Sequence, residues 1–230
     1  MALPLATDSG LCYITSASID KDLRYATTDL MTPPSRDDVL EVIRRCGVAR
    51  PRDLEAAGIS RMWLTRLTRQ GLVTRLGRGL YEVADADWTA HHGYAEVAKR
   101  VPAGIVCLLS ALVFHDLTTQ LPFEVWLAID KKARVPRGLT VAVRLMRFSG
   151  PALTEGVGEH VIDGVTVRIT SPARTVVDCF RYRNTVGLDV ALEALRDCHE
   201  LRLATRDELW ECAGRLRAAN VMRPYLESLM

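Results

Sequence analysis

Residues Asp53–Gly71, with the sequence DLEAAGISRMWLTRLTRQG, predict two short helices joined by a tight turn. Gly58 can take the positive φ that such a turn needs, and Ser60 is a favourable N-cap for the second helix. The residues expected to face a core recur at helical spacing: Ile59, Trp63, Leu64, Leu67 and Leu72. The outer face then carries Arg61, Met62, Thr65, Arg66 and Arg69, and Gly71 ends the helix.

Two apolar runs follow, Leu72–Leu76 and Leu80–Val83, and the link Gly77-Arg78-Gly79 between them predicts a hairpin. No acidic residue lies between Ala56 and Tyr81, whereas five arginines do. A helix-turn-helix followed by a basic hairpin is typical of a winged helix, in which the second helix enters the major groove of DNA. The residues predicted to bind DNA are Ser60, Arg61, Thr65, Arg66, Arg69, Arg75 and Arg78. The alternative is a solvent-exposed basic helix next to a hairpin without function.

Composition limits the classes of protein to consider. A chain of 230 residues with 48% hydrophobic residues predicts a globular protein of one large or two modest domains. The net charge of +2 means that any nucleic-acid surface is local. We expect no membrane span, no leader peptide, no cofactor and no metal site. The six cysteines form no CxxC pair, and four of them lie in apolar surroundings: Cys107, Cys179, Cys198 and Cys212. We therefore expect these four to be buried free thiols, and we expect a cytoplasmic setting.

The elements predict an α+β protein with three segments. Residues 1–35 form an N-terminal extension that we expect to be flexible, and residues 36–84 form a winged helix-turn-helix domain, whose first helix is capped by Ser35 or Asp37. Residues 85–230 form a C-terminal α/β domain, in which a small sheet is flanked by helices and followed by a helical tail. Residues 85–100 are expected to be a connecting helix.

Within the C-terminal domain, local signals place several elements. Alternating apolar residues predict a strand from Val125 to Ile129, and the turn Asp163-Gly164 predicts a hairpin. Ser171-Pro172 predicts the start of a helix that runs to Arg183, and Thr205 begins a capping box for a later helix.

A second basic segment lies in the sheet region. No acidic residue occurs between Asp130 and Glu155, and the segment is a candidate second nucleic-acid surface. An exposed loop and strand face without a ligand is an equally good interpretation. The basic residues are Lys131, Lys132, Arg134, Arg137, Arg144 and Arg147.

Three motifs, in this order, resemble the AbiEi family of antitoxins and transcriptional regulators from type IV toxin–antitoxin (abortive infection) systems. They are the helix-turn-helix with Gly77-Arg78-Gly79-Leu80-Tyr81, the segment Cys107-Leu-Leu-Ser-Ala-Leu112, and the segment Ile169-Thr-Ser-Pro-Ala-Arg-Thr-Val-Val-Asp178. The resemblance spans about residues 37–220. The pair Arg174 and Asp178 belongs to it, and we interpret this pair as a structural ion pair worth a few tenths of a kcal/mol.

The resemblance implies a function for each domain. The winged helix would bind inverted repeats of double-stranded DNA at its own operon and repress that operon. The C-terminal domain would counter a nucleotidyltransferase-like toxin without forming a stable complex with it. The DNA-contacting positions would be Arg61, Thr65, Arg66 and Arg69 in the second helix, and Arg75 and Arg78 in the hairpin.

No catalytic residues are expected, and two alternative functions remain open. A metal-dependent nuclease would use Asp116, Asp130 and Lys132, whose spacing is compatible with a site that holds Mg²⁺. An effector-sensing repressor would combine the winged helix with a C-terminal domain that binds a metabolite. We predict the DNA-binding antitoxin.

Overall fold

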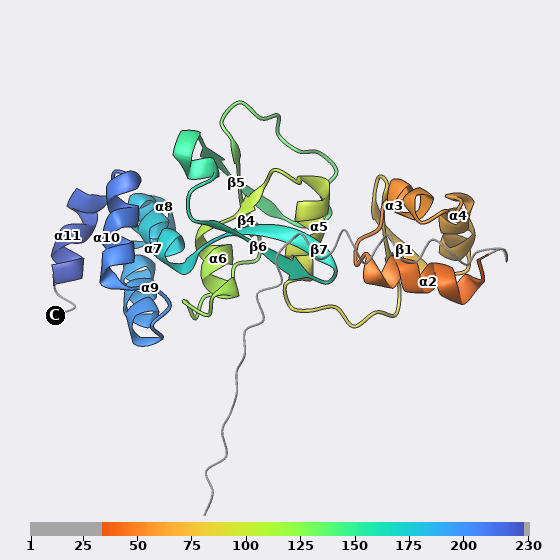
Figure 1. Cartoon of the computed structure of the whole chain (residues 1–230), viewed down its shortest axis with the longest axis horizontal. Helices are drawn as coiled ribbons and strands as arrows, with labels where there is room; N and C mark the ends of the chain where they lie inside the picture. The colour runs from red at the N-terminus through yellow and green to blue at the C-terminus, as the bar shows by residue number, and fades with distance from the viewer. Residues whose placement is uncertain (1–33, 228–230) are drawn as a thin grey trace, which may run out of the picture. The chain divides into compact units, whose positions relative to one another are not determined.

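The computed structural model of the chain describes residues 34–227. The expected N-terminal extension, residues 1–35, lies outside the described part except for its last two positions. The described part combines helices with a two-stranded and a five-stranded sheet, which confirms the predicted α+β class (Figure 1).

Three helices and a hairpin begin the described chain. The helices are α2 (Arg36–Arg45), α3 (Pro51–Ala56) and α4 (Met62–Arg69), and the antiparallel strands are β1 (Val73–Gly77) and β2 (Leu80–Val83). Ser35 is the cap of α2, because its hydroxyl accepts the Asp38 N–H and the Asp38 carboxylate accepts the Ser35 N–H. Gly58 and Gly71 adopt φ values of 73° and 72°, so they end α3 and α4 as expected.

Helix α4 begins one or two residues later than the sequence suggests. Arg61, rather than Ser60, occupies the cap position, and the first turn is closed by short-range bonds such as Trp63 N–H to Ser60 O at 3.1 Å. The Ser60 hydroxyl still accepts the Met62 N–H at 3.3 Å, so it satisfies one of the free amides at the helix start. Trp63, expected to face inward, is only partly buried.

These elements share a small apolar core. Its buried side chains come from all three helices and from the hairpin: Val39, Ile43, Ala49, Leu54, Ile59, Leu64, Leu67, Val73 and Val83. The core fixes which face of α4 is turned inward and leaves the opposite face to solvent.

The five-stranded sheet is mixed, with the order β5-β4-β3-β7-β6. Its strands are β3 (Ile105–Val106), β4 (Val125–Asp130), β5 (Val143–Phe148), β6 (Val157–Ile162) and β7 (Val165–Thr170). Strands β6 and β7 form the predicted antiparallel hairpin around Asp163-Gly164, whereas β4 and β5 are parallel neighbours. The chain passes from β4 to β5 through residues 131–142, which contain no helix.

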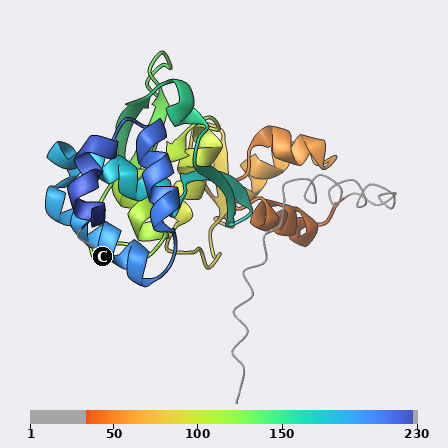
Figure 2. The same cartoon turned by 60° about the vertical axis from the view of Figure 1, so that its left-hand side comes forward.

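Helices cover both faces of this sheet (Figures 1 and 2). Leu127 and Ile129 of β4 pack with α5 (His92–Arg100), whereas Trp126 packs on the other face with α6 (Leu108–Phe114). Strand β4 is therefore buried along almost its whole length, although its sequence shows alternation.

The connecting helix is shorter than expected, because it begins at His92 rather than near Asp85. Thr89 donates both its N–H and its hydroxyl to the Asp163 carboxylate, so its N–H is not used in a helical hydrogen bond.

The tail is helical, as predicted. It contains α7 (Pro172–Arg181), α8 (Arg183–Val186), α9 (Leu188–Glu200), α10 (Arg206–Arg215) and α11 (Ala219–Glu227). The Ser171 hydroxyl accepts the Arg174 N–H, and Thr205 forms the predicted capping box with Glu208. Helix α7 stops at Arg181, two residues before the expected end.

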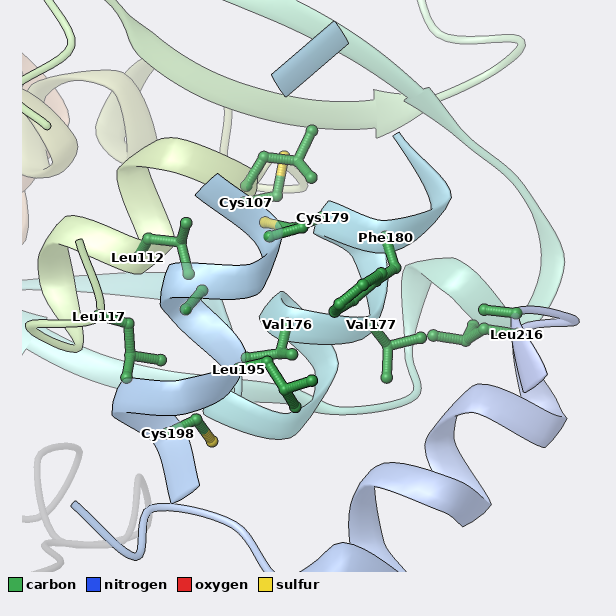
Figure 3. Close-up of a cluster of buried hydrophobic side chains, with 14 of the residues drawn as sticks. Cys107, Leu112, Leu117, Val176, Val177, Cys179, Phe180, Leu195, Cys198 and Leu216 are labelled. Atoms are coloured by element: carbon green, nitrogen blue, oxygen red, sulfur yellow. The ribbon is translucent and has the colours of Figure 1, made fainter. Parts of the chain in front are cut away.

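Figure 3 shows the core on the tail side of the sheet, where side chains of α6, α7 and α9 meet. Cys107, Cys179 and Cys198 are buried there as free thiols, which confirms the expectation for these three, whereas Cys212 is only partly buried. Burial raises the pKa of Cys198 to about 11, so this thiol is held in its neutral form.

Candidate nucleic-acid interface

The exposed face of α4 carries the residues that the sequence analysis selected. Leu64 and Leu67 are buried in the core below, so the helix has a single free face. The residues that the structure leaves exposed on and just before α4 are Ser60, Arg61, Met62, Thr65, Arg66 and Arg69. Three guanidinium groups and two hydroxyl groups thus share one surface with an apolar side chain, Met62, that is 75% exposed.

The arginines of this face are free to bind a ligand. Arg66 lies over the ring of Trp63, with 5.0 Å between its guanidinium carbon and the ring centroid. Within residues 34–227, the side chains of Arg61 and Arg69 have no hydrogen-bond or ion-pair partner. Stacking on Trp63 restricts Arg66 without using its five N–H donors, which remain available for a planar acceptor such as a base edge.

The β1–β2 hairpin places two more arginines near its turn. Arg78 and Gly79 form the turn, where Gly79 adopts a φ of 74°, and a β-bulge lies between Arg75 and Gly77. Arg75 donates to the carbonyl of Gly77 at 3.1 Å, while the exposed side chain of Arg78 has no partner among the described residues.

The structure divides the second basic segment into two groups. Arg144 stacks on Trp126 and pairs with Glu124 at 3.4 Å, and Arg147 donates to the carbonyls of Asp130 and Ala133. The side chains of these two arginines therefore already bind groups within the protein. The other four are exposed in the β4–β5 connection, and their side chains have no partner in the described part of the chain: Lys131, Lys132, Arg134 and Arg137.

Helix α5 joins the N-terminal elements to the sheet through charged contacts. His92 Nε2 lies 2.9 Å from Glu82 of β2, and its Nδ1 lies 2.9 Å from Asp163 in the β6–β7 turn. A carboxylate only accepts hydrogen bonds, so each ring nitrogen of His92 faces an acceptor. At the other end of the helix, Lys99 pairs with Asp53 of α3 at 2.8 Å.

Two glycines allow the backbones to meet at this junction. A Cβ atom on Gly47 would lie 1.6 Å from the carbonyl oxygen of Asp163, and one on Gly164 would lie 2.1 Å from that of Arg45. Val48 and Leu80 are buried in the same apolar cluster as α5 and the sheet. The N-terminal elements are thus packed against the sheet, beyond the covalent link through residues 84–91.

The sequence analysis did not identify these junction residues. The two partners of His92 lie 71 and 10 residues away in the sequence. The sequence around His92 contains no pattern that indicates such contacts.

The motif that contains Arg174 and Asp178 has a structural role in the core. Both side chains are fully buried and lie 2.7 Å apart, and Arg174 also donates to the carbonyls of Ala152 and Glu155. Burial raises the pKa of the Asp178 carboxyl, while Arg174 and Arg181 act in the opposite direction. The predicted ion pair is confirmed, but its value of a few tenths of a kcal/mol applies to an exposed pair, and here both partners are buried. Removing one partner of a buried pair leaves the other charge unpaired in the core, which costs about 3–5 kcal/mol.

The residues of the alternative nuclease have other contacts or positions. The Asp130 carboxylate accepts the backbone N–H of Lys132 at 2.6 Å, and Asp116 is exposed in the turn that follows α6. Among residues 34–227, no three His, Cys, Asp or Glu side chains are grouped in a way that could hold a metal ion.

None of the helices within residues 34–227 has the length and apolar character that crossing a membrane requires.

Comparison with known proteins gives a family match for the N-terminal elements. Residues 37–84 match a family model described as "Transcriptional regulator, AbiEi antitoxin", which confirms the resemblance for this segment. This family is one of regulators rather than of enzymes. No curated protein matches the chain.

Among solved structures, the chain is similar to the crystal structure of the RV2827C protein from Mycobacterium tuberculosis. The TM-score is 0.53 at 16% sequence identity, and the similarity covers 82% of this chain and 74% of the other. At this identity the similarity concerns the fold alone.

Proposed function

We propose that the protein is a DNA-binding antitoxin that represses its own toxin–antitoxin operon. One observation carries the DNA-binding part: α4 presents Arg61, Thr65, Arg66 and Arg69 on one exposed face, within the segment that matches the AbiEi regulator model. In this proposal residues 36–84 are a winged helix-turn-helix domain, α4 is its recognition helix and the β1–β2 hairpin is its wing.

Each group has a distinct role in the proposed complex. Arg66 and Arg69 contact base edges in the major groove, where a guanidinium can donate two hydrogen bonds to guanine. Arg75 and Arg78 contact the phosphate backbone, which positions the protein without reading sequence. The free cations of the β4–β5 connection, Lys131, Lys132, Arg134 and Arg137, make further phosphate contacts.

The C-terminal domain, residues 85–230, supplies the antitoxin activity in this proposal. Its functional partner is a nucleotidyltransferase-like toxin from the same operon, and it acts without a stable complex. The family match within residues 37–84 supports the regulatory half of the proposal more directly than this half.

The first experiment is a gel-shift titration of the full chain against DNA from upstream of its own gene. Wild-type protein should give a sequence-specific shift that weakens steeply with salt, because arginine contacts release counterions. The variant Arg66→Ala/Arg69→Ala should lose the specific shift. The matched control is Arg215→Ala, which removes an exposed arginine from α10 and should bind like wild type.

A second experiment separates repression from neutralisation. The same variants are expressed together with the toxin from the neighbouring gene, and growth and promoter activity are measured. Arg66→Ala/Arg69→Ala should lose repression and keep neutralisation. Loss of both activities in a variant that remains folded would contradict the assignment of antitoxin activity to residues 85–230.

A further inference from the structure

Arg100, at the end of α5, connects two segments that are far apart in sequence. Its Nη1 donates to the carbonyl of Arg78 at 2.7 Å, and its Nη2 donates to the carbonyl of Gly138 at 2.8 Å. Arg78 lies in the turn of the β1–β2 hairpin, and Gly138 lies in the β4–β5 connection. One guanidinium group therefore bridges the hairpin turn that carries Arg78 and the β4–β5 connection that carries Lys131, Lys132, Arg134 and Arg137.

The backbones of these two segments also meet directly. A Cβ atom on Gly77 would lie 3.3 Å from the carbonyl oxygen of Gly138. Gly138 has a φ of 71°, and a Cβ atom there would lie 2.9 Å from Nη2 of Arg100. Any other residue at position 138 would have a strained backbone, and its side chain would crowd the guanidinium group. Glycine at this position therefore allows the close approach.

A second side chain of α5 holds the same connection. Glu96 lies one turn before Arg100 and is 4% exposed. Its carboxylate accepts both the N–H and the hydroxyl of Thr140. Helix α5 therefore fixes the end of the connection through Glu96 and ties it to the hairpin through Arg100.

We propose that Arg100 is a positioning residue for DNA binding: it holds the hairpin arginines and the cations of the β4–β5 connection in one surface. The inference rests on the proposed function. Arg100 is half-buried and each of its terminal nitrogens donates to a backbone carbonyl, so in this proposal it acts through these neighbours. The planar fork of arginine reaches both carbonyls at once, whereas the single ammonium of a lysine does not present two donors in this geometry.

The salt dependence of DNA affinity tests this role. Each phosphate contact contributes about 0.9 to the slope of log K against log salt for duplex DNA. Arg134→Ala/Arg137→Ala removes two cations of the connection, so the slope should fall by up to about 1.8. Arg100→Ala should lower the slope by a similar amount, because the cations of the connection are no longer held beside the hairpin.

Arg100→Lys separates the effect of geometry from the effect of charge. It keeps the positive charge, yet its slope should match that of Arg100→Ala. The combination of Arg100→Ala with Arg134→Ala/Arg137→Ala should lose less affinity than the sum of the two separate losses, because Arg134 and Arg137 are no longer there to be positioned. Arg215→Ala is the control, since its exposed ion pair with Glu211 lies on α10, and its slope should equal that of wild type.

Fluorescence anisotropy of labelled operator DNA with the full chain gives these slopes, and hydrogen exchange on the free protein gives a second measurement. Arg100→Ala should raise exchange in residues 77–80 and 138–140 together, without DNA present. An additive loss in the combined variant would overturn the inference, because Arg100 would then contact DNA itself. An unchanged slope with a lower melting temperature would overturn it too, because the role would be structural only.

These measurements distinguish a failure of the proposed function from a failure of the inference about Arg100. If wild-type protein shows no specific binding, the DNA-binding assignment falls and the inference falls with it. If wild type binds and Arg66→Ala/Arg69→Ala does not, but both Arg100 variants keep the wild-type slope, then only the positioning role is rejected.

Discussion

Helices α4 and α7 both carry arginines that the family resemblance highlights, yet the structure gives these arginines opposite environments. Arg61, Arg66 and Arg69 of α4 are exposed, and none of the three forms an ion pair within the described residues. Arg174 of α7 is fully buried and has three acceptors around it. Arginine therefore has two roles here. On α4 the guanidinium groups are available to a ligand, and on α7 the guanidinium group of Arg174 stabilises the chain around it.

The largest expected effect is on the buried pair of α7. Arg174→Met leaves the Asp178 carboxylate in the core without its main partner, and we expect the free energy of unfolding to fall by about 3–5 kcal/mol. Urea unfolding measures this loss. Arg215→Ala breaks the exposed pair with Glu211 and should change the free energy of unfolding by less than about 1 kcal/mol.

A double replacement sharpens the interpretation of that loss. Arg174→Met/Asp178→Leu removes both charges, so it should recover much of the stability lost by the single replacement. If Arg174→Met alone cost less than about 1 kcal/mol, the buried pair would contribute no more than an exposed one, and the contrast between α7 and α4 would not hold.

The second expected effect is on DNA affinity and concerns α4. If Arg66 reads a guanine edge, Arg66→Ala should cost about 1–3 kcal/mol of binding free energy at one base position. The free energy of unfolding of the Arg66→Ala variant should differ from that of wild type by no more than about 0.5 kcal/mol, because the side chain of Arg66 is exposed. Titrations against a set of operators with single base changes test this. An equal loss on every sequence would make Arg66 a phosphate contact instead.

These two regions also show what the sequence could and could not predict. Caps depend on hydrogen bonds over three residues, so Ser171, Thr205 and the turns at Gly58 and Gly71 could be identified from the sequence. The start of α5 could not, because Thr89 bonds to Asp163, 74 residues away.

The candidate site, too, has features that the sequence could predict and features that it could not. The exposed face of α4 follows from helical spacing and turn chemistry, which are local. The burial of Arg174 depends on elements that the motif itself does not contain, so spacing alone led to an energy that applies to an exposed pair. Arg100 donates to two backbone carbonyls. Every residue has a carbonyl, so such a contact leaves no pattern in the sequence.

The third expected effect is at the junction between the N-terminal elements and the five-stranded sheet. His92→Gln keeps a donor for only one of the two carboxylates, so we expect a loss of about 1 kcal/mol in the free energy of unfolding. A double-mutant cycle with Glu82→Gln, measured by thermal unfolding, isolates the contact with β2. A coupling energy of zero would mean that the contact contributes nothing to holding the N-terminal elements on the sheet.

The smallest expected effect is the response of the C-terminal region to acid. Burial lowers the pKa of His115, and also lowers the pKa of His160, whose ring lies 6.3 Å from that of His115. His115 Nε2 lies 2.7 Å from the carbonyl of Thr170, so the neutral ring, with its proton on Nε2, makes this hydrogen bond.

Because both pKa values are lower in the folded state, the unfolded state binds protons more readily. Stability is therefore complete above the pKa of an unfolded histidine, about 6.5, and is lost as the pH falls through the lower folded values. His115→Gln can still donate to Thr170 but cannot bind a proton, so its melting temperature should fall less than that of wild type between about pH 7 and pH 5. His199→Gln replaces an exposed histidine of α9 and serves as the control. If His115→Gln and wild type lost stability equally on acidification, protonation of His115 would not oppose folding, and the acid response would have to arise from other groups.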